Sequence, residues 1–311
     1  MIAILGSGFG LYGFLPALVQ GCGQTVALPE RYRDRLAQRP ELAAFAPHIR
    51  WFADEQAALE AADGVVMALR PGDQAAWLPR CLALGNLQRL LLEKPLAPTP
   101  QAAAQALQAL DASGKAFALN YSFAHLRWRD RLRDAALQTG ELTIDWQFSA
   151  HHFRTGLDTW KRRHSQGGGV IRFYGIHLIA LLAELGYDTA ITSHTRGQLA
   201  DEPAEWQAVL GGTQRATCRI HVDSRATETR FCVTSGGETL VDLADPFDED
   251  AAQAAKTGLD RRVPVLTQVA LTLWQPSRQP SAWYAASIRL WQAVEDATQT
   301  GAGGDRGQEG H

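Results

Sequence analysis

The feature that most constrains this chain is a glycine-rich turn directly after its first apolar run. Residues 2–5, IAIL, have the composition of a buried strand, and they lead into GSGFGLYG (6–13) and then into the helix-like FLPALVQ. A strand, a glycine turn and a helix N-terminus together can bind a pyrophosphate, because glycine has no Cβ to keep the phosphate from the backbone N–H groups. An ordinary tight turn is the alternative.

Two registers of the pattern G-x-G-x-x-G fit this turn. In the first, Gly6 and Gly8 follow the strand at once, and Leu11 stands where the third glycine would fall. In the second, Gly8, Gly10 and Gly13 satisfy the spacing but begin two residues later. We prefer the first register, since it puts the tight turn at the strand end and leaves Gly10 as an adjacent substitute.

An acidic residue about 20 positions further on would accept the ribose hydroxyls of NAD. Glu30, in VALPERYR, stands at that distance. Arg31 and Arg33 follow it, and their guanidinium groups could instead hold the 2′-phosphate of NADP. A solvated helix start is the third interpretation, so the sequence leaves the choice between NAD and NADP open.

The order of apolar runs predicts an α/β fold with two domains. Within residues 1–120, strand-like runs alternate with helix-like stretches, which is typical of a Rossmann domain with a parallel sheet. Strand-like segments such as LTIDWQFSA and TRFCVTS dominate from about 142 to 243 and predict an antiparallel or mixed sheet in a second domain, residues 121–298. A helix over 281–298 closes that domain, and the glycine-rich tail 300–311 is expected to be disordered.

Composition excludes several classes of protein. No apolar run approaches the roughly 18 residues of a membrane span, and a net charge of −3 with scattered arginines does not fit nucleic-acid binding. The four cysteines lack metal-type spacing, so we expect free thiols, no disulfide and no metal. The chain starts with a strand rather than a signal sequence, so we expect a cytoplasmic protein.

Several motifs in a fixed order give the chain a family resemblance. GSGFGLYGFLPAL is followed by DGVVMALRP (63–71), by Glu-Lys-Pro at 93–95, by GGG at 167–169 and by GIHLI at 175–179. In this order they resemble the glucose–fructose oxidoreductase / inositol dehydrogenase (Gfo/Idh/MocA) family. The resemblance implies a second domain with an open, mostly antiparallel sheet, a nicotinamide cofactor (NAD or NADP), and usually a sugar or cyclitol substrate. The positions expected to bind the cofactor are Gly6, Gly8, Phe9, Gly10, Leu11, Glu30, Arg31, Leu69, Arg70, Pro71, Glu93 and Lys94.

The resemblance also implies catalytic residues. Lys94 matches the lysine at the nicotinamide, where an ammonium would stabilise alkoxide character as hydride moves. His177 matches the motif histidine, which can exchange the hydroxyl proton near neutral pH. Tyr121, at a predicted strand end, is a second candidate donor. Read without the family, Lys94 would be a surface lysine and His177 a core histidine.

One position departs from the family pattern. The family usually has Asp where this chain has Phe173, which makes the predicted pocket more apolar. Residues four apart share a helix face, so Phe173 and His177 are expected to look the same way, while Tyr174 lies about 100° round the helix. Gly175 between them indicates either close approach to a ligand or tight helix packing.

A basic loop precedes the glycines. In TWKRRHSQ, Trp160 matches a family position, and Lys161 begins a run of four basic residues that could hold a phosphate or carboxylate or be a solvated loop. Phe173, Tyr174, Trp160 and Lys161 are therefore the candidate substrate contacts. We expect an NAD(P)-dependent oxidoreductase acting on a sugar-like or nucleotide-sugar carbonyl or alcohol. The alternatives are a reductase of a non-sugar C=O or C=N bond and a non-catalytic nucleotide-binding paralogue.

Partners are expected to be limited to a small-molecule substrate and further copies of the chain. The second sheet is expected to leave one face partly apolar, because segments such as RATCRIHV carry more apolar side chains than a solvated face needs. This face predicts a homodimer or homotetramer.

Overall fold

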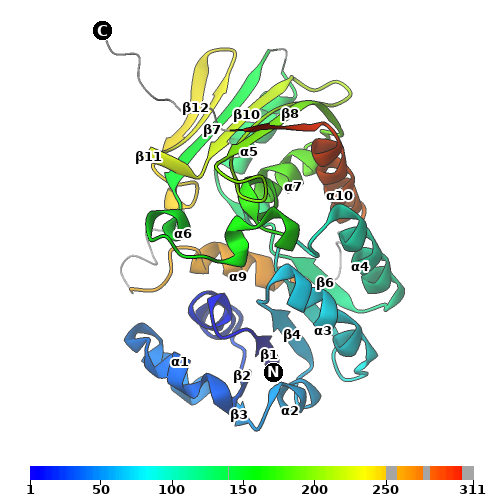
Figure 1. Cartoon of the computed structure of the whole chain (residues 1–311). Coiled ribbons are helices and arrows are strands. Elements are labelled where there is room, and N and C mark those ends of the chain that lie inside the picture. The colour runs from blue at the N-terminus through cyan, green and yellow to red at the C-terminus, as the bar shows by residue number, and fades with distance from the viewer. Residues whose placement is uncertain (139, 250–257, 276–280, 303–311) are drawn as a thin grey trace.

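The strands of the computed structural model form two separate sheets (Figure 1). The structure describes residues 1–138, 140–249, 258–275 and 281–302. The first sheet is wholly parallel, with the strand order β3-β2-β1-β4-β5-β6. Its strands are β1 (Ile2–Leu5), β2 (Val26–Pro29), β3 (Ile49–Phe52), β4 (Gly64–Met67), β5 (Arg89–Leu92) and β6 (Ala116–Leu119).

This strand order is that of a Rossmann sheet, and it confirms the predicted α/β fold class. The runs in β1 and β4 are continuously buried, because helices cover both faces of a parallel sheet. The order reverses between β1 and β4, and ligands of such sheets bind at the carboxyl ends of the strands near that point. The helices of this half are η1 (Gly10–Phe14), η2 (Ala17–Gly21), η3 (Glu30–Tyr32), α1 (Arg33–Ala37), η4 (Pro40–His48), α2 (Glu55–Glu60), α3 (Pro71–Ala83) and α4 (Pro100–Ala112).

The second sheet is mixed and mostly antiparallel, as the family resemblance implies. Its order is β12-β11-β7-β10-β9-β8-β13, with parallel pairing only between β10 and β7 and between β13 and β8 among the described strands. Its strands are β7 (Leu142–Ser149), β8 (Thr189–Gly197), β9 (Pro203–Gly211), β10 (Cys218–Asp223), β11 (Arg225–Ser235), β12 (Glu238–Leu243) and β13 (Thr298–Ala302).

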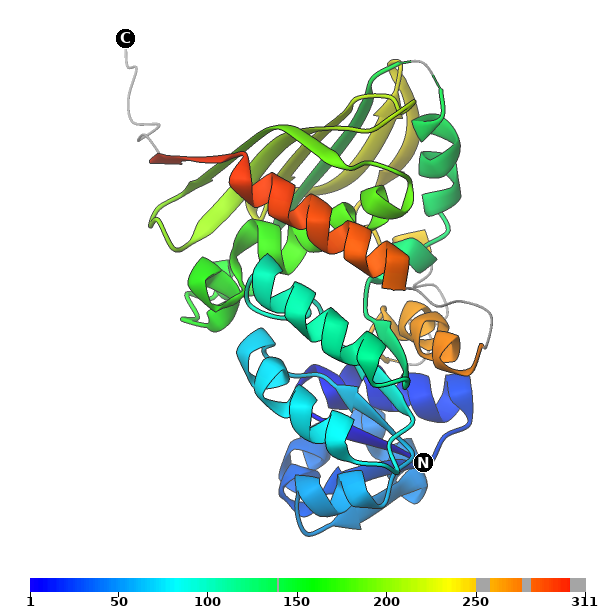
Figure 2. The ribbon, with the colours of Figure 1, turned by 90° about the vertical axis from the view of Figure 1, so that its right-hand side faces the viewer.

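Helices pack against one face of this sheet. Figure 2 shows α10 (Ser281–Asp296) lying beside α4 of the first half, and α10 also packs on α7 (Ile176–Glu184). The contact between α10 and α4 joins the two halves of the molecule. The other described helices that follow β6 in the chain are η5 (Ser122–His125), α5 (Arg129–Ala136), α6 (His151–Arg154), η6 (Trp160–Arg162), η7 (His164–Gln166), η8 (Val170–Gly175), α9 (Val263–Leu271) and η9 (Thr272–Trp274).

Helix α9 returns to the first half of the molecule, although it follows the second sheet in sequence. Val263 and Leu266 share one hydrophobic cluster with Leu11, Phe14 and Leu18 of the first helix. In Figure 1, α9 lies directly above that helix. The Rossmann core is therefore built from two stretches of chain, whereas the sequence analysis drew the first domain as residues 1–120 alone.

The end of the chain differs in part from its prediction. The helix expected over 281–298 is observed as α10, and β13 follows it and pairs with β8. Residues 300–302 of the tail that was expected to be disordered lie in this strand. The rest of that tail, 303–311, lies outside the described residues.

The outer face of the second sheet is polar along β10. Cys218, Ile220 and Val222 of β10 are buried, while Arg219 and His221 point outward. The apolar side chains of the RATCRIHV segment, which supported the oligomer prediction, therefore face the helices, because alternate residues of a strand point to opposite faces. The homo-oligomer stays a prediction, which light scattering at micromolar concentration tests.

The sequence predicts no membrane span and four free thiols. Within the described ranges, no helix is long and apolar enough to cross a bilayer. The four cysteines, Cys22, Cys81, Cys218 and Cys232, are free thiols. No group of three or more His, Cys, Asp or Glu side chains gathers as a metal site in the part of the chain that the structure describes.

Candidate active site

The glycine turn occupies the carboxyl end of β1. Gly6 has φ +113°, and a Cβ there would come within 2.2 Å of the Ala68 carbonyl oxygen, so only glycine fits between β1 and β4. A Cβ on Gly8 would meet nothing within 4 Å, which leaves the front of the turn open to a ligand. At Gly10 a Cβ would come within 2.7 Å of Ile4, so that glycine serves packing. This geometry favours the register that starts at Gly6.

The first helix continues from this turn through two π-helical segments, η1 and η2. Leu11, in place of the third glycine, is buried in the core cluster shared with α9. Phe9 folds back on the helix, where its ring lies 5.3 Å from that of Phe14 and fills the space a Cβ on Gly13 would need. The first N–H groups of a helix have no intrahelical partner and are free for a phosphate.

The residues expected at the ribose lie at the carboxyl end of β2. Glu30 forms an ion pair with Arg33, and Arg31 pairs with Glu55, all near the surface. The Tyr32 hydroxyl accepts a hydrogen bond from the Gly6 N–H at 2.9 Å, which ties this segment to the glycine turn. Carboxylates and guanidinium groups alternate here, so the geometry does not decide between NAD and NADP.

The residues expected after β4 begin helix α3. Arg70 is its N-cap, Pro71 is its first residue, and Leu69 is partly buried against the core. Within α3, the wholly buried Gln74 side chain holds the Glu-Lys-Pro loop that follows β5. Its amide donates to the carbonyl oxygen of Glu93 at 2.8 Å and to that of Leu96 at 3.0 Å, and its oxygen accepts from the Glu93 N–H at 2.9 Å.

Glu93 is a buried carboxyl group beside the candidate catalytic lysine. Its Oε1 accepts a hydrogen bond from the Asn120 side-chain amide at 2.8 Å. Burial raises the pKa of Glu93, against the neighbouring Lys94 charge, which lowers it. Glu93 thus lies where it can influence the charge on Lys94.

The Lys94 ammonium group lies against Phe173. It donates to the Phe173 carbonyl oxygen at 2.6 Å and sits 4.0 Å from the centroid of the Phe173 ring. Burial lowers the pKa of Lys94 to about 7, with Glu93 opposing the shift and Lys161 adding to it. The lysine can therefore both donate and accept a proton near neutral pH.

His177 is buried at the start of α7. Its Nδ1 lies 3.5 Å from the Ser122 hydroxyl, and its ring stacks on Phe123 with centroids 4.8 Å apart. Burial, followed by the charge of Lys94, lowers the pKa of His177 well below its ordinary range. The imidazole is thus neutral at neutral pH, which differs from the expectation that it titrates there.

Tyr121 lies in the core. It is 1% exposed, its ring packs against Trp283 and Tyr284 of α10, and its hydroxyl has no hydrogen-bond partner among the described residues. Burial raises the pKa of its phenol. These contacts do not bring it to Lys94 or Phe173, so the expectation that it faces the ligand is not supported.

The candidate substrate residues gather around Phe173. The Phe173 ring lies 5.4 Å from that of Trp160 and 4.8 Å from that of Tyr174, both edge to face, and 5.2 Å from the Lys161 ammonium group. Phe173 belongs to the π-helical η8, whereas His177 belongs to α7. The prediction that the two side chains point in the same direction assumed an α-helical turn. In the structure the two side chains contact different residues.

Gly175 serves packing rather than ligand approach. A Cβ there would come within 2.8 Å of the Trp206 ring of β9. The motif helix therefore rests directly on the second sheet. Gly167 and Gly169 have φ of +84° and +73°, a backbone conformation that favours glycine. The glycine triplet thus shapes the entry into η8.

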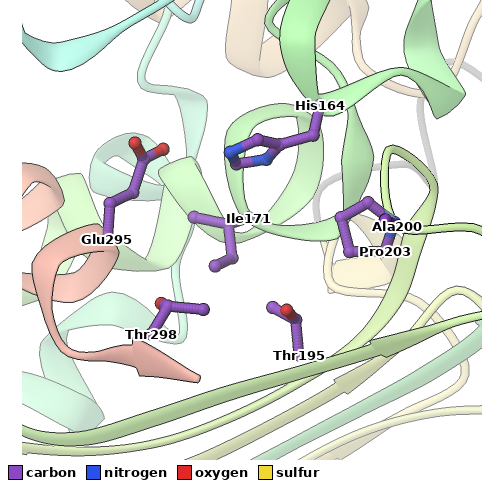
Figure 3. A pocket seen from close by; sticks show the side chains of 7 residues that line it. All are labelled: His164, Ile171, Thr195, Ala200, Pro203, Glu295 and Thr298. Carbon is purple, nitrogen blue, oxygen red and sulfur yellow. The ribbon is translucent and has the colours of Figure 1, made fainter. Parts of the chain in front are cut away.

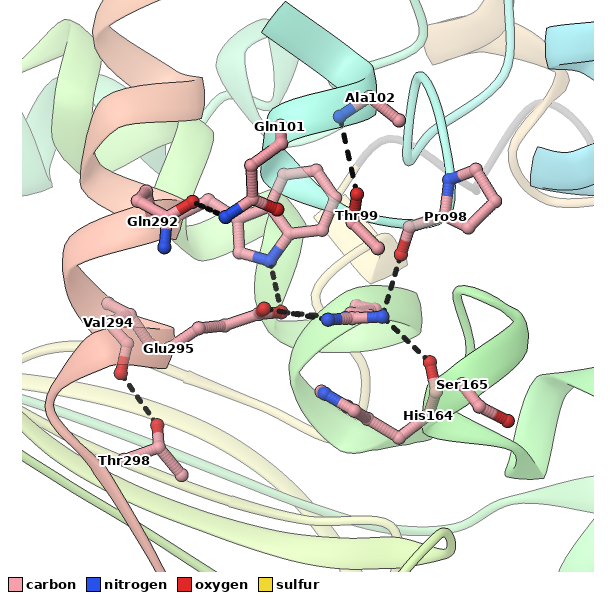
Figure 4. Close-up of polar contacts among 12 residues, drawn as sticks. Pro98, Thr99, Gln101, Ala102, His164, Ser165, Gln292, Val294, Glu295 and Thr298 are labelled. Atoms are coloured by element: carbon pink, nitrogen blue, oxygen red, sulfur yellow. Dashed lines mark hydrogen bonds and ion pairs between the residues drawn. The ribbon is translucent and has the colours of Figure 1, made fainter.

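Arg172 connects this helix to three other segments. Its guanidinium group forms a two-pronged ion pair with Glu295 of α10, with contacts of 2.6 and 2.7 Å, and donates to the carbonyl oxygens of Pro98 and His164 at 2.7 and 2.9 Å. Trp291 also donates to Glu295 at 2.6 Å. Figure 4 shows Pro98, His164 and Glu295 converging on this point. The network holds the lysine loop against the helix that carries Phe173.

The four basic side chains of the loop lie in three different environments. Arg162 and Arg163 both pair with the buried Glu202, which neutralises them in part. His164 lines a hollow of about 190 Å³ behind the motif helix, next to Glu295 and Thr298 (Figure 3). Lys161 is the member of the run whose ammonium reaches the Phe173 ring.

Several residues of the site lie outside the sequence motifs. Gln74, Asn120 and Ser122 are single polar side chains in apolar surroundings, and Arg172 lies inside the motif without belonging to it. Arg262, near the start of α9, lies 4.4 Å from the centroid of the Phe9 ring. The first four of these residues could have been found as polar residues close to a motif. Nothing in the sequence around Arg262 indicates that it belongs to the site.

Comparison with known proteins identifies the fold. No protein-family model matches the chain, and no curated protein sequence matches it significantly. Among solved structures, the chain is similar to WlbA (WbpB) dehydrogenase from Thermus thermophilus, in complex with NAD and UDP-GlcNAcA. The identity is 16% and the TM-score 0.72, over 97% of this chain and 96% of that chain.

Two further solved structures are similar over nearly their whole length. KijD10, a 3-ketoreductase from Actinomadura kijaniata, in complex with NADP and TDP-benzene, has 16% identity and a TM-score of 0.68, over 97% of this chain and 98% of that chain. GenD2 from gentamicin A biosynthesis, in complex with NAD, has 17% identity and a TM-score of 0.71, over 95% and 93%. At these identities the likeness establishes a shared fold, the two-domain fold that the Gfo/Idh/MocA resemblance predicts.

Proposed function

We propose that the protein is an NAD(P)-dependent oxidoreductase that transfers hydride between a nicotinamide and a carbonyl or alcohol of a sugar-like or nucleotide-sugar substrate. The observation that carries the proposal is Lys94, a half-buried lysine with a pKa of about 7, at the carboxyl edge of a Rossmann sheet. A perturbed lysine at this edge is typical of a catalytic group.

The residues present fit a dinucleotide. The open front of the glycine turn at Gly8 and the helix N-terminus beyond it would hold the pyrophosphate. Glu30 or Arg31 would bind the adenosine ribose, and Lys94 with the Glu-Lys-Pro loop would lie at the nicotinamide. When bound, the cofactor supplies or accepts the hydride.

Lys94 supplies the charge and the proton. As an ammonium it stabilises negative charge that develops on the substrate oxygen, and its lowered pKa lets it return the proton afterwards. Gln74 fixes the backbone on either side of this lysine, and the Phe173 carbonyl oxygen orients its ammonium group. His177, neutral and buried, would hydrogen-bond the substrate hydroxyl or accept its proton.

The substrate class follows from the surroundings of Phe173. Trp160 and Tyr174 present aromatic edges and faces suited to the apolar face of a sugar ring, and Lys161 adds a positive charge. The solved structures of similar fold hold UDP-GlcNAcA and TDP-benzene, which supports a nucleotide-linked ligand for this chain as well.

Fluorescence titration with NADH and NADPH tests the proposal first. We expect one of the two to bind, and a panel of nucleotide sugars and their keto forms should then change the absorbance of the bound cofactor. Binding without turnover on any carbonyl would instead favour a nucleotide-binding protein with no catalysis. No binding of either dinucleotide would contradict the proposal itself.

A second candidate function keeps the cofactor and changes the substrate. Phe173 replaces an acidic residue with an aromatic ring next to the lysine, and this favours a less hydroxylated ligand, such as a non-sugar C=O or C=N compound. Adding deoxysugars, simple ketones and imines to the same panel separates the two candidates.

A further inference from the structure

Arg262 lies beside the glycine turn, although it belongs to the segment that follows the second sheet. Its guanidinium carbon is 4.4 Å from the centroid of the Phe9 ring and 5.9 Å from that of Tyr12. Phe9 and Tyr12 stand in the first turn of the helix that begins the Rossmann domain, next to Gly8. Helix α9, which starts at the next residue, packs on that same helix and fixes this position.

Asp260 binds one edge of the Arg262 guanidinium group. Asp260 accepts from its Nε and from one of its terminal nitrogens, both at 2.8 Å, and also from the Arg262 backbone N–H at 2.9 Å. A guanidinium group has five N–H donors, and this fork occupies the Nε side. Tyr12 is a further hydrogen-bond partner of the guanidinium group, so the N–H donors that neither Asp260 nor Tyr12 occupies remain for a ligand that lies over the turn.

The local charge balance points to an anionic ligand. A helix N-terminus carries partial positive charge, so a cation beside it is unfavourable unless negative charge lies there too. Asp260 offsets the charge of Arg262 and the Glu93 carboxyl group lies beside Lys94, while the ammonium groups of Lys161 and of protonated Lys94 add positive charge at the Phe173 ring. Burial is the main cause that lowers the pKa of Lys94 and of His177, and the positive charge of Arg262 lowers both further. The electrostatic field of Arg262 therefore reaches the candidate catalytic residues.

We propose that Arg262 binds the pyrophosphate of the dinucleotide, so that the cofactor site is completed by a residue from the segment after the second sheet. This inference rests on the proposed function. Asp260 orients the guanidinium group, and the Phe9 ring packs against it. Arginine suits this task because its planar fork can bind a carboxylate at one edge and a phosphate at the other.

The test compares Arg262→Gln with its neighbour, Arg261→Gln. Arg261 is half-exposed and pairs with Asp245 and Asp248, so it is a matched control of the same type, one position away. The affinities of both variants and of the unaltered protein are measured for the preferred reduced dinucleotide and for ADP-ribose, which keeps the pyrophosphate and lacks the nicotinamide. We expect Arg262→Gln to weaken both ligands by the same factor, about 10- to 100-fold, and Arg261→Gln to leave both unchanged.

Each other outcome has a distinct meaning. Equal binding by Arg262→Gln and the unaltered protein would overturn the inference and leave the proposed function standing. Weakened dinucleotide with unchanged ADP-ribose would move Arg262 to the nicotinamide end and also overturn it. If the unaltered protein binds neither NADH nor NADPH, the proposed function fails, and the inference fails with it.

Two further measurements guard against a folding defect. Arg262→Lys keeps the charge but not the fork, so it should bind ADP-ribose more tightly than Arg262→Gln and less tightly than the unaltered protein. In the unaltered protein, ADP-ribose should protect Arg262, but not Arg261, from modification by phenylglyoxal, read by peptide mass mapping. Equal modification of Arg262 with and without ADP-ribose would contradict the inference.

Discussion

Phe173→Asp restores the acidic residue that the family usually has beside the lysine. The change removes a half-buried ring, worth about 1–1.5 kcal/mol by burial, and two cation–π contacts of about 0.5–1 kcal/mol each. The two ammonium groups that lose these contacts belong to Lys94 and Lys161, at 4.0 and 5.2 Å from the ring centroid.

The electrostatic attraction of the introduced carboxylate to the two ammonium groups offsets the lost ring contacts. At those distances and an effective dielectric constant near 20, its attraction to each charged ammonium is about 3–4 kcal/mol. Removing the carboxylate from water costs several kcal/mol, so the opposing contributions nearly cancel. We expect the melting midpoint to fall by less than about 8 °C, since about 1 kcal/mol corresponds to ~2–4 °C in domains of this size.

The new carboxylate should also change the protonation of Lys94. An opposite charge nearby favours the ammonium form, so the pKa of Lys94 should rise from about 7 toward its ordinary value of 10.5. Competitive labelling of amines by a limiting reagent, followed by peptide mass spectrometry, reports the neutral fraction of Lys94 without a substrate. At pH 8 labelling of Lys94 should slow by about tenfold in Phe173→Asp.

Phe173→Asn is the control, because it removes the ring without adding charge. Labelling of Lys94 in this variant should stay close to that of the unaltered protein, or rise if the group becomes more exposed. Equal labelling rates in the Asp and Asn variants would show that the side chain at 173 does not face the ammonium group. A melting midpoint more than about 10 °C lower in both variants would show that Phe173 is a core residue.

Three more predictions follow from the site and the sheet. Lys94→Ala should lower kcat by at least about 10²-fold with cofactor affinity within a few-fold, and unchanged turnover would remove Lys94 from the chemistry. His177→Asn should lower kcat but keep the pH midpoint near 7, which belongs to Lys94; a lost midpoint would assign it to His177 instead. His221→Gln should destabilise the fold at pH 5 and have little effect at pH 9. The Asp145 hydrogen bond raises the pKa of His221, so its contribution is present below pH 6.5 and is lost as the pH rises through the folded-state pKa; equal melting shifts at both pH values would refute this.

Much of the fold was predictable because its signals are local. β1 and β4 are continuous apolar runs and β5 carries three consecutive leucines, so their burial in a parallel sheet needs no other information. β3 carries a weaker sequence signal, because IRWF mixes Arg50 and Trp51 into a four-residue edge strand. β9 also carries a weak sequence signal, because PAEWQAVLG begins with proline and contains alanines. Burial by neighbouring strands outweighs this weak intrinsic strand preference.

The site was predictable only where a motif marks it. Lys94 and Phe173 were both found from the sequence, but their contact was not, because it joins residues 79 positions apart through a π-helical turn. The neutral state of His177 depends on burial by Phe123 and other neighbours that no motif specifies. Arg262 reaches the glycine turn only through the packing of α9, which is a property of the tertiary fold.

The return of α9 to the first helix sets an order of events during synthesis. Leu11, Phe14 and Leu18 leave the ribosome early, but Val263 and Leu266, which cover them, follow about 140 residues after β6. At about 5–20 residues per second this is a delay of roughly 10–30 s. Through that interval the nascent Rossmann half exposes the apolar face of its first helix, so a chaperone can bind there, and a stop codon placed after β6 would yield a fragment that aggregates.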